Sequence, residues 1–228
     1  MLNKGKVAII GSGFVGSTTA YTMMIDGVVS EIVVVDLNKN KAEGDVLDMN
    51  HGMSFVSPVK IYAGEYSDIK SSDIVIITAG VAQKEGETRT ALLKRNIKVF
   101  DAIIDSMLPY LDEDTLVLVV TNPVDVLTYY TIKKSGLPAH RVLGSGTVLD
   151  TSRLKFLLSE HTGIDSRNVH TYVLGEHGDT EVPAFSLTTI AGMSVDDYCQ
   201  SCGECETHTN MDQIAEKVRN AAYEIIEK

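Results

Sequence analysis

A histidine between two glycines is the first group in this sequence that could move a proton. His177 lies in the stretch LGEHGD, just past a segment that reads as a buried strand. Asp150 and Arg153 are three residues apart, which places an acid and a base on one face of a helix. A carboxylate there can orient an imidazole, and a guanidinium can clamp a carboxylate through two hydrogen bonds. A lone histidine is more often structural, but these companions favour acid/base chemistry on a substrate that carries a carboxylate.

A second arginine, Arg89, follows a glycine-containing loop at 80–86 that could move. It lies at the expected start of a helix, where the helix dipole disfavours a cation. Arg89 therefore either points to solvent or has a task in binding.

A glycine loop near the N-terminus could hold a phosphate-bearing ligand. Gly11, Gly13 and Gly16 form the pattern GxGxxG between an apolar run and an expected helix, and Asp36 ends the next apolar run. Gly11 permits a tight turn, Gly13 lets the backbone approach a pyrophosphate, and Gly16 lets the helix pack on the strand. Because Asp36 can accept from both ribose hydroxyls and would repel a 2′-phosphate, the combination predicts NAD rather than NADP. A helix-start turn beside an exposed aspartate is the structural alternative.

These residues lie in a chain that alternates between strands and helices. Continuous apolar runs predict parallel strands covered on both faces, and they lie at 6–10, 32–35, 59–62, 74–78 and 116–120. An apolar stripe predicts a helix over 88–110. The sequence thus predicts an α/β fold with a doubly wound parallel sheet, in a domain over 1–143.

After that domain the character of the chain changes. Helices are expected over 148–160 and from 211 to the end, with strand-like segments at 169–174 and 182–190. We expect a smaller α+β substrate domain over 144–228.

Composition and charge exclude some classes of function. The chain has 228 residues, 44% of them hydrophobic, but no apolar run near the ~18 residues of a membrane helix. Its 20 Lys and Arg against 31 Asp and Glu give a net charge of −11, which disfavours nucleic acid. We expect a cytoplasmic protein with a small-molecule substrate, and neither a nucleic-acid nor a membrane partner.

The three cysteines, Cys199, Cys202 and Cys205, lie in one segment, followed by His208. An iron–sulfur cluster needs a fourth cysteine, and zinc ligands usually come as two separated pairs. We expect thiols on a surface helix or loop, and no metal site.

Six motifs occur in order along essentially the whole chain: GSGFVGST, VVVDLN, ITAGVAQKEGETR, TNPVDVLTY, RVLGSGTVLDTSRL and YVLGEHGDTEVP. Together they resemble the lactate/malate dehydrogenase family, most closely its bacterial L-lactate dehydrogenases. Six ordered motifs are far more specific than any one of them. The resemblance implies a Rossmann-type NAD-binding domain and an oxidoreductase of glycolysis and fermentation that acts on the CH–OH group of a 2-hydroxy acid.

The resemblance also implies roles for single residues. His177 would be the acid/base, Asp150 its orienting partner, and Arg153 the group that binds the substrate carboxylate. Arg89, on a closing loop, would polarise the substrate carbonyl. Asn122 would lie at the nicotinamide and substrate end, before a cis-proline. The implied cofactor-binding residues are Gly11, Gly13, Phe14, Val15, Gly16, Asp36, Thr78, Gly80 and Asn122.

Substrate choice in this family turns on the position of Gln83. The malate branch resembles this chain but carries an arginine there, which pairs the second carboxylate of oxaloacetate. Neutral Gln83 favours pyruvate and L-lactate as substrates. A solvent-facing glutamine, a longer 2-oxo acid, a malate or broader 2-hydroxyacid dehydrogenase, and a nucleotide-binding chain without turnover are the alternatives.

Two further expectations come from the resemblance. Relatives activated by fructose 1,6-bisphosphate carry an arginine and a histidine on subunit-facing segments, where this chain has Lys155 and His170. Lysine binds phosphate only as a point charge, so these residues leave effector binding open. The resemblance also implies a homotetramer, or at least a dimer.

The C-terminal end departs from the family pattern. Family members run on for roughly 80 further residues that complete the second domain. We therefore expect a C-terminally incomplete substrate domain, in either a fragment or a truncated product.

Overall fold

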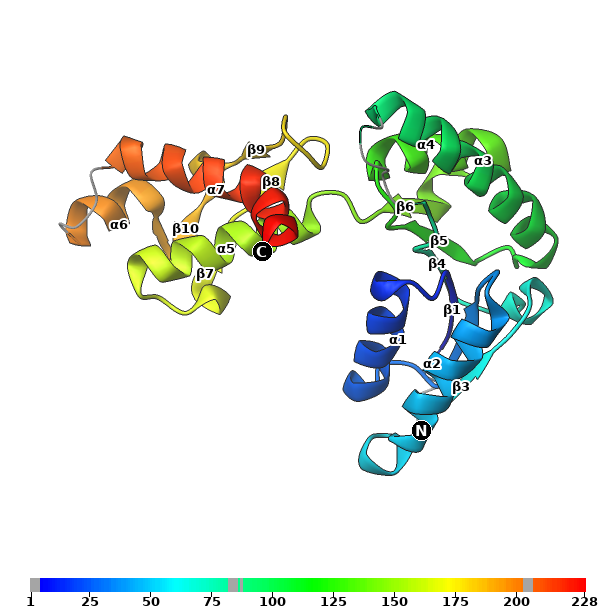
Figure 1. Cartoon of the computed structure of the whole chain (residues 1–228). Coiled ribbons are helices and arrows are strands. Elements are labelled where there is room, and N and C mark those ends of the chain that lie inside the picture. The colour runs from blue at the N-terminus through cyan, green and yellow to red at the C-terminus, as the bar shows by residue number, and fades with distance from the viewer. Residues whose placement is uncertain (1–4, 82–85, 87, 203–206) are drawn as a thin grey trace. The chain divides into compact units, whose positions relative to one another are not determined.

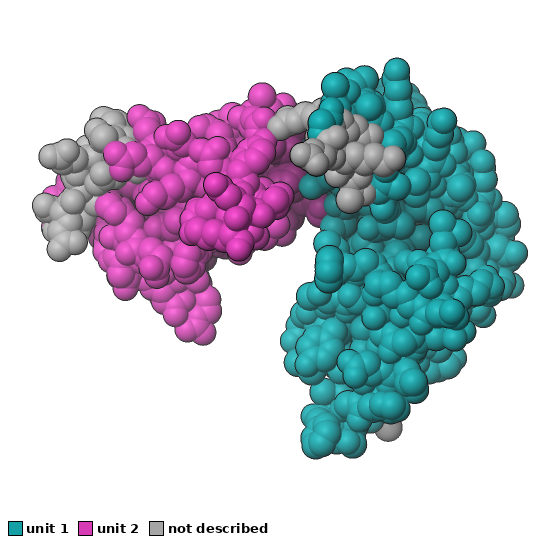
Figure 2. Space-filling model, in the orientation of Figure 1, with its two compact units in different colours: residues 1–144 teal, residues 145–228 magenta. Residues whose placement is uncertain are grey.

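The structure of the chain is a computed structural model that describes residues 5–81, 86, 88–202 and 207–228. It divides into two compact units, Met1–Gly144 and Ser145–Lys228, which Figure 2 colours separately.

A six-stranded parallel sheet forms the centre of the first unit. Its strands are β1 (Lys6–Ile10), β2 (Glu31–Val35), β3 (Lys60–Ala63), β4 (Ile74–Ile77), β5 (Leu116–Val119) and β6 (Val142–Gly144). The spatial order is β3-β2-β1-β4-β5-β6, with every neighbouring pair parallel. The doubly wound parallel sheet is thus confirmed. All five predicted runs are strands of this sheet, and β6 was not among them because its three residues are too few to stand out as an apolar run.

Helices cover both faces of this sheet (Figure 1). They are α1 (Phe14–Asp26), α2 (Lys39–His51), α3 (Arg89–Met107) and α4 (Val124–Ser135). Neighbouring residues of β1 face opposite layers: Ile9 packs in the core with α1 and α2, while Ala8 and Ile10 pack with α3 and α4. Burial on both faces explains why these strands read as continuous apolar runs.

Helix α3 is shorter than the stretch 88–110 predicted for it. Thr88 caps its start, with Oγ1 accepting a hydrogen bond from the Ala91 amide. The helix ends at Met107 and continues as a 3-10 turn, Leu108–Tyr110, that contains Pro109. Proline lacks the amide that another α-helical turn would need.

The second unit packs three helices against short antiparallel strands. The helices are α5 (Val148–Thr162), α6 (Val195–Cys202) and α7 (Thr207–Glu227). The strands are β7 (Val169–His170), β8 (Val173–Leu174), β9 (Val182–Pro183), β10 (Thr189–Ile190) and β11 (Met193–Ser194). They form two sheets, one ordered β11-β10-β7 and one that pairs β8 with β9.

Both strands expected in this unit are wrong as continuous elements. The segment 169–174 divides between the two sheets, with β7 on β10 and β8 on β9. Between them the hydroxyls of Thr171 and Thr188 form a buried hydrogen bond of 2.6 Å. The segment 182–190 is divided by a 3-10 turn that follows Pro183, which cannot donate to a strand ladder.

The expected surface position of the cysteines is wrong for Cys199. Its side chain is 3% exposed and lies in the core of the second unit, with Leu154, Leu158 and Val218. A thiol packs there as a small apolar group. Cys202 ends α6, and Cys205 lies outside the described residues.

No helix in the described part of the chain is both long and apolar enough to cross a membrane.

Candidate active site

The glycine loop of the first unit is shaped by backbone contacts. Gly11 has φ +107°, and a Cβ there would lie 2.6 Å from the Ala79 amide nitrogen. A Cβ on Gly16 would lie 1.8 Å from the Gly11 carbonyl oxygen. The Thr78 hydroxyl donates to that same carbonyl at 2.9 Å, so the first helix is held close against the sheet.

Gly13 differs from its two neighbours in the motif, because a Cβ there would meet no atom of the described residues within 4 Å. It is the N-cap of α1, and among the residues that the structure describes no side chain accepts a hydrogen bond at that N-cap. The open space and the helix N-terminal amides fit a pyrophosphate that approaches the backbone. Phe14 and Val15, the next two residues, are exposed.

Asp36 is oriented by two amides of neighbouring loops. Its Oδ2 accepts from the Ser12 amide at 2.6 Å and its Oδ1 from the Asn38 amide at 2.7 Å. A carboxylate oxygen can accept two hydrogen bonds, so both oxygens can also accept from the hydroxyls of a ribose. The loop and Asp36 therefore fit a dinucleotide such as NAD.

A second group of predicted site residues lies just after the ends of β4 and β5. Asn96, 1% exposed, accepts from the Val81 amide at 2.9 Å and donates to the Asn122 carbonyl at 3.3 Å. The Asn122–Pro123 peptide is cis, which confirms that prediction. A Cβ on Gly80 would lie 2.5 Å from Thr121 Cγ2, so a larger residue in this turn would displace the Thr121 side chain. Asn96 was not foreseen, because one amide inside an apolar helix stripe gives no signal of its partners.

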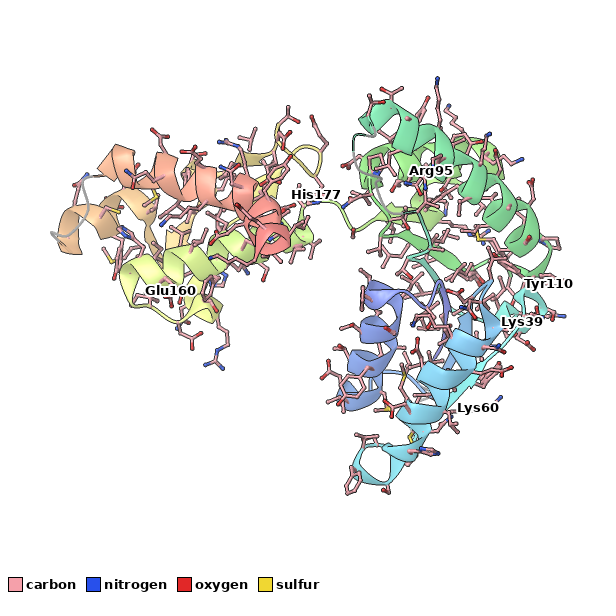
Figure 3. All side chains as sticks on the ribbon, viewed as in Figure 1. Lys39, Lys60, Arg95, Tyr110, Glu160 and His177 are labelled. Atoms are coloured by element: carbon pink, nitrogen blue, oxygen red, sulfur yellow. The ribbon has the colours of Figure 1, made fainter. Side chains whose placement is uncertain are left out.

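The second unit brings together the predicted acid/base group and its partners. Asp150, on α5 and only 1% exposed, lies between the guanidinium of Arg153 and the imidazole of His177. Its Oδ2 is 2.6 Å from His177 Nδ1, and its Oδ1 accepts from Arg153 Nη1 at 2.8 Å. His177 lies in the loop after β8, as Figure 3 shows. Because Nδ1 is bonded to the carboxylate, Nε2 is the nitrogen suited to exchange a proton with a ligand.

Threonine side chains hold β8 beside α5 and thereby fix the histidine loop. The Thr147 hydroxyl donates to the Val173 carbonyl at 2.6 Å, and the Thr151 hydroxyl accepts from the Val173 amide at 3.0 Å. From α7, Arg219 donates to the Glu181 carbonyl at 3.3 Å and the Tyr223 hydroxyl bonds Asp179 at 3.1 Å. The loop from 175 to 181 is therefore tied to helices on both of its flanks.

A buried acid that the sequence reasoning missed lies next to this cluster. Glu181 is 2% exposed, and its carboxyl oxygen lies within 4.8 Å of ligand atoms of Asp150 and His177. Burial first, and then the charge of Asp150, raise its pKa above the usual range. Three such atoms can hold a metal, but the Arg153 cation on Asp150 and the short Asp150–His177 bond favour a hydrogen-bonded site. Its only sequence signal is an acid two residues before Pro183.

Two of the predicted site residues are not placed by the structure. Gln83 lies outside the described residues. Arg89 is the first residue of α3, and its side chain lies outside the described part. The effector candidates both lie in the second unit, Lys155 half-buried on α5 and His170 exposed on β7.

The two units match two parts of one known family. The description "lactate/malate dehydrogenase, NAD binding domain" fits residues 5–144, and the "alpha/beta C-terminal domain" of that family fits residues 147–228. The chain belongs to the lactate/malate dehydrogenase family. It carries the family's NAD-binding domain, which agrees with the NAD predicted from Gly13 and Asp36.

Individual relatives within the lactate/malate dehydrogenase family are similar over nearly the whole chain. An L-lactate dehydrogenase of Acetivibrio thermocellus is 60% identical over 97% of this chain and 69% of its own length. One from Clostridium perfringens is 56% identical over 97% of this chain and 69% of its own length.

Solved structures of lactate dehydrogenases share the fold of both units. A lactate dehydrogenase from a Medee basin deep-sea metagenome library has a TM-score of 0.95 and 45% identity, over all of this chain and 72% of its own. The ligand-bound minor L-lactate dehydrogenase of Enterococcus mundtii has a TM-score of 0.94 and 42% identity, over 99% and 72%.

Proposed function

We propose that this chain is an NAD-dependent L-lactate dehydrogenase that reversibly reduces pyruvate to L-lactate. The observation that carries the proposal is the buried Asp150, bonded to His177 on one oxygen and to Arg153 on the other. That arrangement supplies a proton donor beside a cation that can bind a carboxylate. The names of relatives up to 60% identical support the same activity.

The proton is the part of the reaction that His177 handles. NADH, held by the glycine loop and Asp36, would supply a hydride to the carbonyl carbon of the 2-oxo acid. Negative charge then grows on the carbonyl oxygen, and His177, as imidazolium, donates the proton from Nε2. Asp150 stabilises the imidazolium and holds the ring through Nδ1. In the reverse direction neutral His177 accepts the proton of the hydroxyl group.

The arginines orient and polarise the substrate in this proposal. A guanidinium has five donors, so Arg153 can bond Asp150 through Nη1 and still clamp the substrate carboxylate. Arg89 stabilises the charge that develops on the carbonyl oxygen. Asn122, before the cis-proline, is proposed to contact the substrate end of the bound nucleotide.

Substrate choice rests on Gln83 in this proposal. A neutral amide offers no cation to the second carboxylate of oxaloacetate, and an unpaired charge in a closed site is costly. The small apolar methyl group of pyruvate leaves nothing unpaired.

Assembly, regulation and location are further parts of the proposal. We infer a cytoplasmic homotetramer that works in fermentation and glycolysis. Lys155 and His170 are proposed to bind fructose 1,6-bisphosphate, with the lysine as a point charge.

The test is NADH oxidation with pyruvate, oxaloacetate and a branched 2-oxo acid, side by side. We expect pyruvate to be preferred over oxaloacetate by at least ~10²-fold in kcat/KM. Preference for oxaloacetate would make the chain a malate dehydrogenase. NADH binding without turnover of any of the three would leave only a nucleotide-binding protein.

A further inference from the structure

Glu181 is a buried acid to which the mechanism above gives no task. It lies just before β9, is 2% exposed, and faces Asp150, which is 1% exposed. Their carboxyl oxygens lie within 4.8 Å of each other. Two carboxylates this close and this buried do not both ionise, because each disfavours the charge of the other.

The partners around the two acids decide which of them keeps the charge. Asp150 bonds the guanidinium of Arg153 at 2.8 Å and the imidazole of His177 at 2.6 Å. Glu181 Oε1, by contrast, has no hydrogen-bond partner among the described residues. An ionised carboxylate in that place would be a buried charge with one bare oxygen, which is strongly disfavoured. The charge therefore belongs on Asp150 and the proton on Glu181.

The charged and titratable groups around Glu181 come from three segments. Asp150 and Arg153 lie on α5, His177 and Asp179 on the loop before Glu181, and Arg219 on α7. Arg219 donates to the main-chain carbonyl of Glu181 at 3.3 Å. A backbone hydrogen bond from Gly178 favours the ionised form, but burial and Asp150 outweigh it and raise the pKa of Glu181.

We propose that Glu181 is a positioning residue for the Asp150–His177 pair, whose protonated carboxyl group donates a hydrogen bond to the Asp150 carboxylate. That bond draws negative charge away from Asp150, so the aspartate stabilises the His177 imidazolium less strongly. The bond thereby weakens the interaction of Asp150 with the proton of His177, the group that exchanges a proton in the proposed reaction. The consequence for catalysis rests on the proposed function, but the hydrogen bond itself does not.

The test is an NMR titration of the His177 ring in the whole chain, with the signal assigned by its loss in His177→Asn. Glu181→Gln keeps a neutral donor, whereas Glu181→Met keeps the length and removes the donor. We expect the His177 pKa to stay within about 0.3 unit in Glu181→Gln and to rise by at least about 0.5 unit in Glu181→Met. The exposed Glu160→Gln on α5 is the matched control for loss of a distant charge.

Each other outcome overturns the proposal. If Glu181 were ionised, both variants would remove a negative charge and both would lower the His177 pKa. If Glu181 only filled space, neither variant would change the pKa measured for the His177 ring. Should Glu181→Met fail to fold, the ¹³C signal of the Glu181 carboxyl group in the unaltered chain decides. That carboxyl group must ionise at a pH above the ordinary glutamate range, and ionisation at an ordinary glutamate pKa refutes the donor.

The same variants separate this inference from the proposed function. The ring titration needs no turnover, so the pattern in His177 can appear in a chain that does not reduce pyruvate. In that case the hydrogen bond stands and the lactate dehydrogenase proposal fails. If pyruvate is reduced, the pH profile of kcat/KM should shift upward in Glu181→Met and stay in place in Glu181→Gln.

Discussion

The two units hold their functional groups by different means. In the first unit the backbone positions them: Gly11, Gly13 and Gly16 shape a loop at the end of β1, and backbone amides orient Asp36. In the second unit side chains position them: Thr147 and Thr151 hold β8 by hydrogen bonds, and Asp150 holds His177. A site that depends on backbone geometry can be recognised from a local sequence motif. A site that depends on side-chain contacts is formed by residues far apart in the chain, and no local motif reveals it.

The largest expected effect tests whether Gln83, in the first unit, selects the substrate, while His177, in the second unit, transfers the proton. Gln83→Arg adds an always-charged fork that can pair the second carboxylate of oxaloacetate and leaves an unpaired cation over the methyl group of pyruvate. We expect the ~10²-fold preference for pyruvate to reverse in favour of oxaloacetate. Steady-state kcat/KM for both substrates measures it, with Gln83→Lys as a control that carries the charge without the fork. A ratio that hardly changes would show that position 83 does not select the substrate.

The next effect removes the proton donor of the second unit and leaves the first unit intact. His177→Asn should lower kcat by a factor on the order of 10² or more, because the carbonyl oxygen loses its proton source. NADH affinity, measured by fluorescence titration, should stay within about twofold of the unaltered chain. His51→Asn, an exposed histidine on α2, is the control. Near-normal turnover in His177→Asn would remove this residue from the mechanism.

A pair of glycine variants separates the folding and binding roles of the backbone-made site. In Gly16→Ala the new methyl group meets the Gly11 carbonyl, so the unfolding midpoint should fall by several degrees, about 4 °C or more. In Gly13→Ala it enters open space at an ordinary φ of −70°, so the midpoint should change by less than about 3 °C. NADH affinity should nevertheless fall at least ~10-fold in Gly13→Ala, because the methyl group occupies the approach to the pyrophosphate. Equal loss of stability in both variants would contradict this division.

Cofactor choice should follow from Asp36. We expect at least a tenfold preference for NADH over NADPH in kcat/KM, about 1.4 kcal/mol, because the carboxylate accepts from the ribose hydroxyls and repels a 2′-phosphate. Asp36→Asn should narrow that ratio, and one of the two neighbouring amides keeps a side-chain oxygen to bond. Similar kcat/KM for the two cofactors in the unaltered chain would show that Asp36 does not contact the ribose.

The contrast between the units also explains what could be predicted from the sequence. Continuous apolar runs located β1, β2, β4 and β5 to within a residue or two, because strands buried on both faces need apolar residues throughout. In the second unit the same reasoning predicted one strand over 169–174 where the structure has β7 and β8. The break between them is at Thr171, which is buried and bonds Thr188, and nothing in the local sequence marks it. Asp150 and His177 were paired from spacing and resemblance. Glu181 was missed, because its burial depends on α5, β9 and α7 meeting, which no local pattern records.

The smallest expected effect is a pH dependence of stability. We expect it from the buried acids of the second unit and not from the glycine loop of the first. The pKa of Glu181 is raised in the folded chain by burial and by Asp150. Folding therefore takes up a proton at any pH between the unfolded and the folded pKa. The stabilising contribution of the protonated form is complete below the unfolded pKa, near 4.3, and is lost as the pH rises through the folded value. Glu181→Gln cannot ionise and so keeps that contribution at every pH.

The unfolding midpoints of Glu181→Gln and the unaltered chain are compared from pH 5 to pH 8. The midpoint of the variant should rise relative to that of the unaltered chain as the pH rises. Glu176→Gln is the matched control, since Glu176 lies on the same loop but is exposed, and a hydrogen bond from Thr180 lowers its pKa. Removing a carboxylate that is favoured in the folded state has the opposite sign, and its effect lies at and below the ordinary glutamate pKa near 4.3. The unfolding midpoint of Glu176→Gln relative to the unaltered chain should therefore stay nearly constant from pH 5 to pH 8. If both variants changed in parallel with pH, net charge rather than the buried pair would set the dependence, and Glu181 would be ionised beside Asp150.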